Sequence, residues 1–153
     1  MANSYSQIYL QLIFTVKYRR ATLDKTWRDE LFSFMSGIIN NTGNKTVIIN
    51  GVEDHLHCFL ILKPNTKISE LTQKVKSSSS KWINENNLTP QKFQWQSGYG
   101  VFSYSKSHVG RVYNYIKNQE IHHKEISFKQ EYLDFLKKFG IPYEERYIFE
   151  ELK

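Results

Sequence analysis

Two histidines separated by one residue form the most chemically suggestive pattern in the chain. His55 and His57 open an apolar run, residues 55–62, that predicts a β-strand. Alternate side chains of a strand share a face, so both imidazoles point the same way, about 6–7 Å apart. Cys58 points to the opposite, wholly apolar face, which is typical of a core. The two imidazoles can converge on one metal ion, and Asp54 can act as an oxygen ligand or orient an imidazole. A pair of half-buried histidines without a ligand is the alternative.

A tyrosine on a predicted helix is the second candidate reactive group. At helical spacing, Arg111, Tyr115, Gln119 and His122 form one polar stripe. An apolar stripe beside it is expected to dock on the sheet and contains Val109, Val112, Tyr113 and Ile116. A phenol is a weak nucleophile unless a cation or metal ion activates its target. With ten tyrosines in the chain, packing is the alternative role for Tyr115.

The elements that must position these residues follow from hydrophobic periodicity. Strands are predicted at 8–17, 46–52, 55–62 and 93–105, and helices at 23–41, 68–84, 107–122 and 128–139. The tail at 146–149 is expected to add a short edge strand. The order β-α-β-β-α-β is that of a split βαβ, ferredoxin-like α+β domain. We therefore expect an antiparallel sheet with helices on one face and the histidine pair on a central strand.

The composition of the chain narrows the classes of function that it can have. The 153 residues are the size of one domain, residues 1–153, and the net charge of +6 with 15% aromatics favours a nucleic-acid partner. A single cysteine excludes a disulfide framework and a cysteine-rich zinc site within the chain. No long apolar segment or charged-then-apolar leader is evident, so we expect no membrane association and a cytoplasmic location.

Taken together and in order, these motifs resemble the HUH endonucleases. More specifically, they are similar to the single-tyrosine transposases of the insertion sequence 200/605 type and their relatives linked to repetitive extragenic palindromes. The resemblance covers nearly the whole chain. It rests on Lys17-Tyr18-Arg19-Arg20, Asp54-His55-Leu56-His57, Trp95-Gln96-Ser97-Gly98-Tyr99-Gly100, Tyr115-Ile116-Lys117-Asn118-Gln119, His122-His123 and Phe139-Gly140-Ile141.

The resemblance implies a role for each matching residue. His55, His57 and Gln119 would bind Mg²⁺ or Mn²⁺, and Tyr115 would be the nucleophile that forms a 5′-phosphotyrosine link to DNA. Asp54, Arg111 and His122 would assist this site. The partners implied are single-stranded DNA with a subterminal hairpin and a second copy of the chain in a homodimer, in the cytoplasm of a prokaryote. Expected phosphate contacts are Lys17, Arg19, Arg20, Lys74, Lys76, Lys81 and Arg111, and expected stacking residues are Tyr18, Trp95 and Tyr99.

Three other functions remain open on the sequence. A catalytically silent or domesticated hairpin-binding protein has the same fold, although the presence of both histidines, Tyr115 and Gln119 argues against it. A ferredoxin-like RNA-binding module would stack bases on sheet aromatics. A replication initiator or relaxase would use the same chemistry, but usually within a longer chain.

Overall fold

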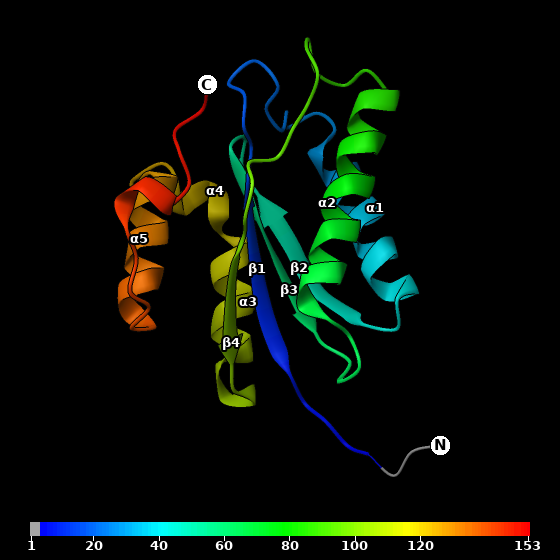
Figure 1. Ribbon diagram of the computed structural model, residues 1–153, viewed down its shortest axis with the longest axis vertical. Coiled ribbons are helices and arrows are strands. Elements are labelled where there is room, and N and C mark those ends of the chain that lie inside the picture. Colours follow the sequence, from blue (N-terminus) through cyan, green and yellow to red (C-terminus); the bar gives the residue numbers. More distant parts are fainter. Residues whose placement is uncertain (1–3) are drawn as a thin grey trace.

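A computed structural model describes residues 4–153 of the chain. Its elements are β1 (Tyr9–Thr15), α1 (Arg28–Asn41), β2 (Lys45–Gly51), β3 (His55–Ile61), α2 (Ile68–Glu85), β4 (Gly100–Tyr104), the 3₁₀ turn η1 (Lys106–His108), α3 (Val109–Lys117), α4 (Gln119–His122), α5 (Phe128–Lys138) and the 3₁₀ turn η2 (Glu145–Tyr147). The sheet lies between two layers of helices (Figure 1).

The four strands form one antiparallel sheet in the order β2-β3-β1-β4. This confirms the split βαβ topology and places the histidine pair on β3, one of the two central strands. The pairing of β1 with β3 sets Thr15 opposite His55 and Ile13 opposite His57. Residues directly opposite on antiparallel strands share a face, so both histidines lie on the Ile13 side of the sheet.

Helices α1 and α2 cover the other face of the sheet (Figure 1). The main core joins this sheet face to the apolar stripes of the two helices, and includes Leu12, Cys58, Met35 and Val75, all fully buried. The prediction that Cys58 faces the core is therefore confirmed. The prediction of helices on one face of the sheet is met by α1 and α2, and the helices after β4 add a layer on the other face (Figure 1).

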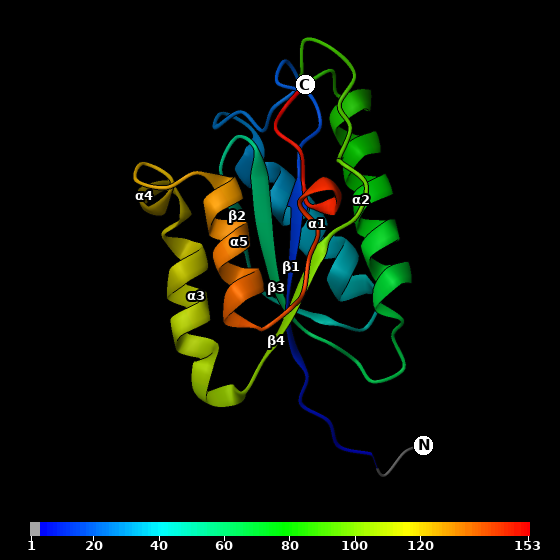
Figure 2. The same ribbon diagram turned by 60° about the vertical axis from the view of Figure 1, so that its left-hand side comes forward.

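The C-terminal helices cover the face that carries the histidines (Figure 2). Helix α5 packs Phe128 and Tyr132 against Ile13 and Phe102, while Ile116 of α3 packs against Phe59 in a second cluster. Ile13 of β1 and Phe59 of β3 point to this side and are fully buried, so this face contributes to the core as well. Within the described residues, helices therefore lie over both faces of the sheet, unlike the open sheet on which an RNA-binding module stacks bases.

Several predicted boundaries differ from the structure. Helix α1 begins at Arg28, because Asp24 accepts a hydrogen bond from the Thr26 backbone amide and holds the preceding residues in a turn. The helix predicted at 107–122 begins as the 3₁₀ turn η1, continues as α3, and is separated from α4 by a break at Asn118.

The fourth strand and the tail also differ from their predictions. Strand β4 is shorter than predicted, since Gly98 has a positive φ of 84° that bends the chain before the strand. The edge strand predicted at 146–149 is wrong. The Gln96 side chain binds both the N–H and the carbonyl of Glu150, which replaces a strand partner there. Across residues 4–153, no helix combines the length and apolar character needed to cross a membrane.

Candidate active site

The two histidines on β3 are held in one orientation by partners on neighbouring segments. Nδ1 of His55 lies 2.7 Å from Oδ1 of Asp54, and Nδ1 of His57 lies 2.6 Å from Oε1 of Gln11 on β1. The Gln11 amide nitrogen donates to the Tyr104 hydroxyl, which leaves its oxygen to accept from His57. Both Nδ1 atoms are therefore donors, and both Nε2 atoms face the site, the arrangement typical of metal-binding histidines.

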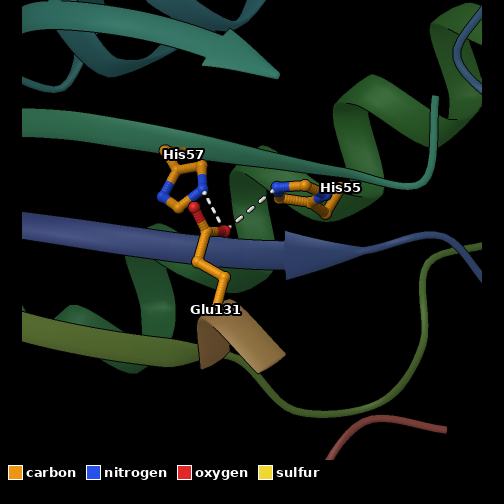
Figure 3. A group of neighbouring side chains, drawn as sticks. All are labelled: His55, His57 and Glu131. Atoms are coloured by element: carbon orange, nitrogen blue, oxygen red, sulfur yellow. Dashed lines mark hydrogen bonds and ion pairs between the residues drawn. The ribbon is translucent and has the colours of Figure 1, made fainter. Parts of the chain in front are cut away.

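Glu131 of α5 lies between the two imidazoles (Figure 3). Its Oε1 atom is 3.1 Å from Nε2 of His57 and 3.3 Å from Nε2 of His55. The three side chains are buried, and one potential ligand atom from each lies within 4.8 Å of the others. This cluster forms because α5 packs its aromatic side chains on the sheet and carries Glu131 on the same buried face.

Tyr115 and Gln119 reach the same carboxylate from the polar stripe of α3 and α4. The Tyr115 hydroxyl donates to Oε2 of Glu131, and the Gln119 amide nitrogen lies 3.2 Å from that oxygen. Oε1 of Gln119 is 3.0 Å from Nε2 of His55. The predicted site residues His55, His57, Tyr115 and Gln119 are thus brought together within one chain.

The end of α3 is fixed to the sheet by Asn50 of β2. Its amide nitrogen donates to the carbonyls of Ile116 and Lys117, at 3.0 and 3.1 Å. These carbonyls belong to the last turn of the helix, where intrahelical partners are missing. Asn50 therefore sets the position from which Tyr115 and Gln119 enter the site.

Of the three residues expected to assist, two contact the site directly. Asp54 orients His55, and the His122 ring stacks on Tyr115 with centroids 4.6 Å apart. Arg111 is exposed one turn before Tyr115 and lines a cavity that Tyr115 also borders. In the adjacent helix stripe, Val112 and Ile116 are buried as predicted, whereas Tyr113 is 39% exposed and does not dock on the sheet.

The charges in the cluster depend on one another. Burial alone would lower the pKa of His55, but hydrogen bonds with Asp54 and Glu131 outweigh it and raise the pKa to about 9. Burial lowers the pKa of His57, against the opposing effect of Glu131. Burial also opposes ionisation of Glu131, yet the facing imidazoles of His123, His55 and His57, with Nε2 atoms 3.1 to 3.3 Å from Oε1, hold its pKa well below the usual range. Burial and the Glu131 charge raise the pKa of Tyr115.

The donor set fits a divalent cation. Two imidazole nitrogens, a carboxylate oxygen and the Gln119 amide oxygen converge, and their supporting hydrogen bonds are already made. Without a cation, a proton on Nε2 of His55 satisfies the facing oxygens of Gln119 and Glu131. A cation bound there would replace that proton.

Four contributors were given no role from the sequence: Gln11, Asn50, His123 and Glu131. Nε2 of His123 lies 3.2 Å from Oε1 of Glu131, and its Nδ1 lies 3.0 Å from the Ile126 carbonyl. A signal for Glu131 was present, because it interrupts an otherwise apolar helix face that contains Phe128 and Tyr132. No comparable pattern marks Gln11 or Asn50, and His123 stood only within the His122-His123 pair of the resemblance, without a role.

The predicted DNA contacts are spread over two regions. Lys17, Tyr18, Arg19 and Arg20 follow β1 at the end of the sheet where His55 lies, while Lys74 and Lys81 are exposed on α2. Lys76 is instead engaged within the fold, because its ammonium donates to the carbonyls of Gln96 and Gly98.

The two remaining aromatic candidates lie beside this region. Trp95 is not an exposed stacking residue, since it is 9% exposed and donates to Ser79 from within the core. Tyr99 is half-buried.

Comparisons with known proteins point to one family of transposases. The family model described as "Transposase IS200 like" matches residues 4–119. A crystal structure of a candidate transposase from Deinococcus radiodurans R1 superposes with a TM-score of 0.62 at 22% identity, covering 78% of this chain and 95% of that one. A REP-associated tyrosine transposase bound to a REP hairpin superposes with a TM-score of 0.61 at 13% identity, covering 82% and 74%. No curated protein matches the chain.

At these identities the two structures show a shared fold. The family match spans most of the chain and includes the strand with both histidines and the helix with the tyrosine. The chain therefore belongs to the IS200-like family of single-tyrosine transposases.

Proposed function

We propose that this protein cuts and rejoins single-stranded DNA at hairpin-marked ends through a covalent bond to Tyr115. The observation that carries the proposal is the convergence of the Tyr115 hydroxyl, His55 and His57 on one buried carboxylate. A nucleophile and a divalent-cation site then lie close enough to act on the same phosphate.

His55, His57, Gln119 and Glu131 are the proposed ligands of Mg²⁺ or Mn²⁺. The bound cation would polarise the scissile phosphate and stabilise the charge that develops on its oxygens. The residues around it have separate tasks. Asp54 and Gln11 keep the imidazoles facing inward, and α5 shields one side of the cluster from water.

In the proposed reaction, the Tyr115 oxygen attacks phosphorus and the bond from phosphorus to the 3′-oxygen breaks. The proton of Tyr115 leaves for water along the hydrogen bond that the phenol already makes to Oε2 of Glu131, since that carboxylate is too weak a base to keep it. The departing 3′-oxygen gains a proton and becomes a free hydroxyl. Because the phosphotyrosine ester replaces the phosphodiester, a 3′-hydroxyl from another strand can reverse the step without ATP.

The proposed DNA contacts outside the reacting centre are the basic cluster after β1 and the exposed lysines of α2. Lys17, Arg19 and Arg20 would contact phosphates, and Tyr18 would stack on an unpaired base. The hairpin in the structure of the REP-associated transposase supports a hairpin ligand here. Lys76 is not among these contacts, because its ammonium already donates to the carbonyls of Gln96 and Gly98.

We also propose how the protein assembles and where in the cell it acts. Residues 1–153 would form one catalytic domain, acting as a homodimer on DNA in the prokaryotic cytoplasm. Tyr115 reaches the histidines of its own chain, so each protomer would contribute a complete site in this arrangement. The second copy would then hold the second DNA end.

The test is adduct formation on a labelled single strand that carries a hairpin from the DNA flanking the gene. With Mn²⁺, wild-type protein should give a protein–DNA adduct that resists denaturation. Tyr115→Phe should abolish the adduct and keep hairpin affinity within about twofold, whereas Tyr113→Phe, an exposed tyrosine on the same helix, should leave the adduct unchanged. Hairpin binding without any adduct would refute the enzymatic proposal and support a binding-only protein.

A further inference from the structure

A cavity of about 530 Å³ opens between α3 and α5, directly beside the reactive tyrosine. Tyr115 and Glu131 form its inner end, and Gln11 lines its floor. Its volume is in the range of pockets that hold small ligands. The proposed metal site meets this cavity only at its inner end, and the basic cluster after β1 does not line it.

The cavity wall offers aromatic surface. Tyr104 and Phe135 line it, and both side chains are half-buried. Edge contacts with Phe59 and Phe139, at 5.9 and 5.5 Å between centroids, hold the Tyr104 ring. Its hydroxyl accepts from Gln11 at 2.7 Å. A ring fixed in this way is suited to contact a flat, polar-edged ligand such as a nucleobase.

The rim of the cavity is cationic. Arg111 on α3 and Lys138 on α5 are exposed at opposite sides, and neither forms an ion pair with any residue of the described chain. Of the two carboxylates that line the cavity, Glu131 is engaged by histidines, and Asp134 accepts a hydrogen bond from Gln130. The unpaired cations are complementary to a phosphate. They also disfavour a second copy of this chain, whose net charge is +6.

We infer that this cavity binds one nucleotide of the single strand, immediately next to the scissile phosphate. The base would lie against Tyr104 and Phe135, and its phosphate would contact Arg111 and Lys138. The inference rests on the proposed function, since a strand whose phosphate meets Tyr115 must pass the mouth of the cavity. Gln11 joins the cavity floor to His57 at 2.6 Å, so the occupied cavity would adjoin the metal-binding histidines.

Photocrosslinking tests the position of the base without requiring cleavage. Tyr115→Phe protein would be mixed with hairpin-bearing strands that carry 5-iodouracil at successive positions outside the hairpin, and irradiated. Mass spectrometry should place the crosslink from one position on Tyr104 or Phe135. Crosslinks confined to other residues would overturn the inference.

Lys138→Ala tests the phosphate contact, with Lys137→Ala as the matched control, because Lys137 is the neighbouring exposed lysine that does not line the cavity. Lys138→Ala should weaken binding of the full strand several-fold and reduce the slope of log affinity against log salt by about one. Affinity for the isolated hairpin should stay unchanged. An equal effect of both variants, or an effect on the isolated hairpin, would contradict the inference.

Failure of the inference and failure of the proposed function give different results. An adduct without a crosslink in the cavity would support the proposed cleavage activity and refute the nucleotide pocket. A crosslink in the cavity without an adduct would support the nucleotide pocket and refute the proposed cleavage chemistry.

Discussion

Replacing Glu131 with glutamine is the most direct test of the buried cluster, because it removes a charge with almost no change in shape. Oε1 of Glu131 lies 3.1 to 3.3 Å from Nε2 of His55, His57 and His123, and Oε2 accepts from Tyr115. Glutamine keeps only one oxygen, so its amide hydrogens must face some of these donors.

The expected cost follows from the burial of the group, since Glu131 is 2% exposed. A hydrogen bond to a charged group contributes about 1.5–3 kcal/mol, and breaking a buried ion pair costs about 3–5 kcal/mol. We therefore expect Glu131→Gln to lower the free energy of unfolding by about 3 kcal/mol in the absence of metal. For a chain of this length, that corresponds to a fall in Tm of roughly 6–12 °C.

The assay is urea denaturation at pH 7 with a chelator, followed by the same titration with Mn²⁺. Glu125→Gln is the control, because Glu125 is exposed in the loop before α5 and its side chain makes no hydrogen bond or ion pair within the described chain. Mn²⁺ should stabilise wild type and stabilise Glu131→Gln less. A metal-free loss below about 1 kcal/mol, or one equal to that of Glu125→Gln, would refute the reasoning that this carboxylate holds the histidines together.

Three further predictions concern pH, the end of α3 and the end of β2. Because the pKa of folded His55 is raised from 6.5 to about 9, its stabilisation of the metal-free protein should be complete below pH 6.5 and lost as pH rises through 9, by at most about 3 kcal/mol. Urea midpoints across this range should decline in wild type and in the exposed-site control His108→Asn. A flat profile in His55→Asn would show that the decline comes from His55. Asn50→Ala should cost about 1–2 kcal/mol and slow adduct formation at unchanged hairpin affinity, since two carbonyls of α3 lose their donor. Asn114→Ala, on the exposed side of α3, should do neither, and equal kinetics for the two variants would contradict a positioning role. Gly51→Ala should destabilise the protein by about 2–4 kcal/mol, because the added Cβ would lie 2.3 Å from the His55 carbonyl oxygen. Gly37→Ala should instead stabilise the protein by about 0.5–1 kcal/mol, because Gly37 lies within α1 and has open space around it. Thermal denaturation of both glycine variants checks this opposite sign.

Much of the fold and half of the site follow from short-range patterns. The period-two alternation of β1 and β3 determines which face carries His55 and His57, because neighbouring side chains of a strand must point to opposite sides. The spacing of four between Tyr115 and Gln119 places both on one side of a helix for a similar reason. These relations depend only on backbone geometry, so the sequence by itself determines them.

Contacts between distant segments were decided only by tertiary packing. Glu131 lies 74 residues from His57, and the two meet because the aromatic face of α5 is buried against the sheet. The same packing engages Lys76 with loop carbonyls and buries Trp95, two residues whose types alone suggested DNA contacts. The break at Asn118 also depends on long-range contacts, since Asn50 binds the carbonyls just before it. Local periodicity specifies the direction of a side chain, but which distant group it meets depends on how the helices cover the sheet.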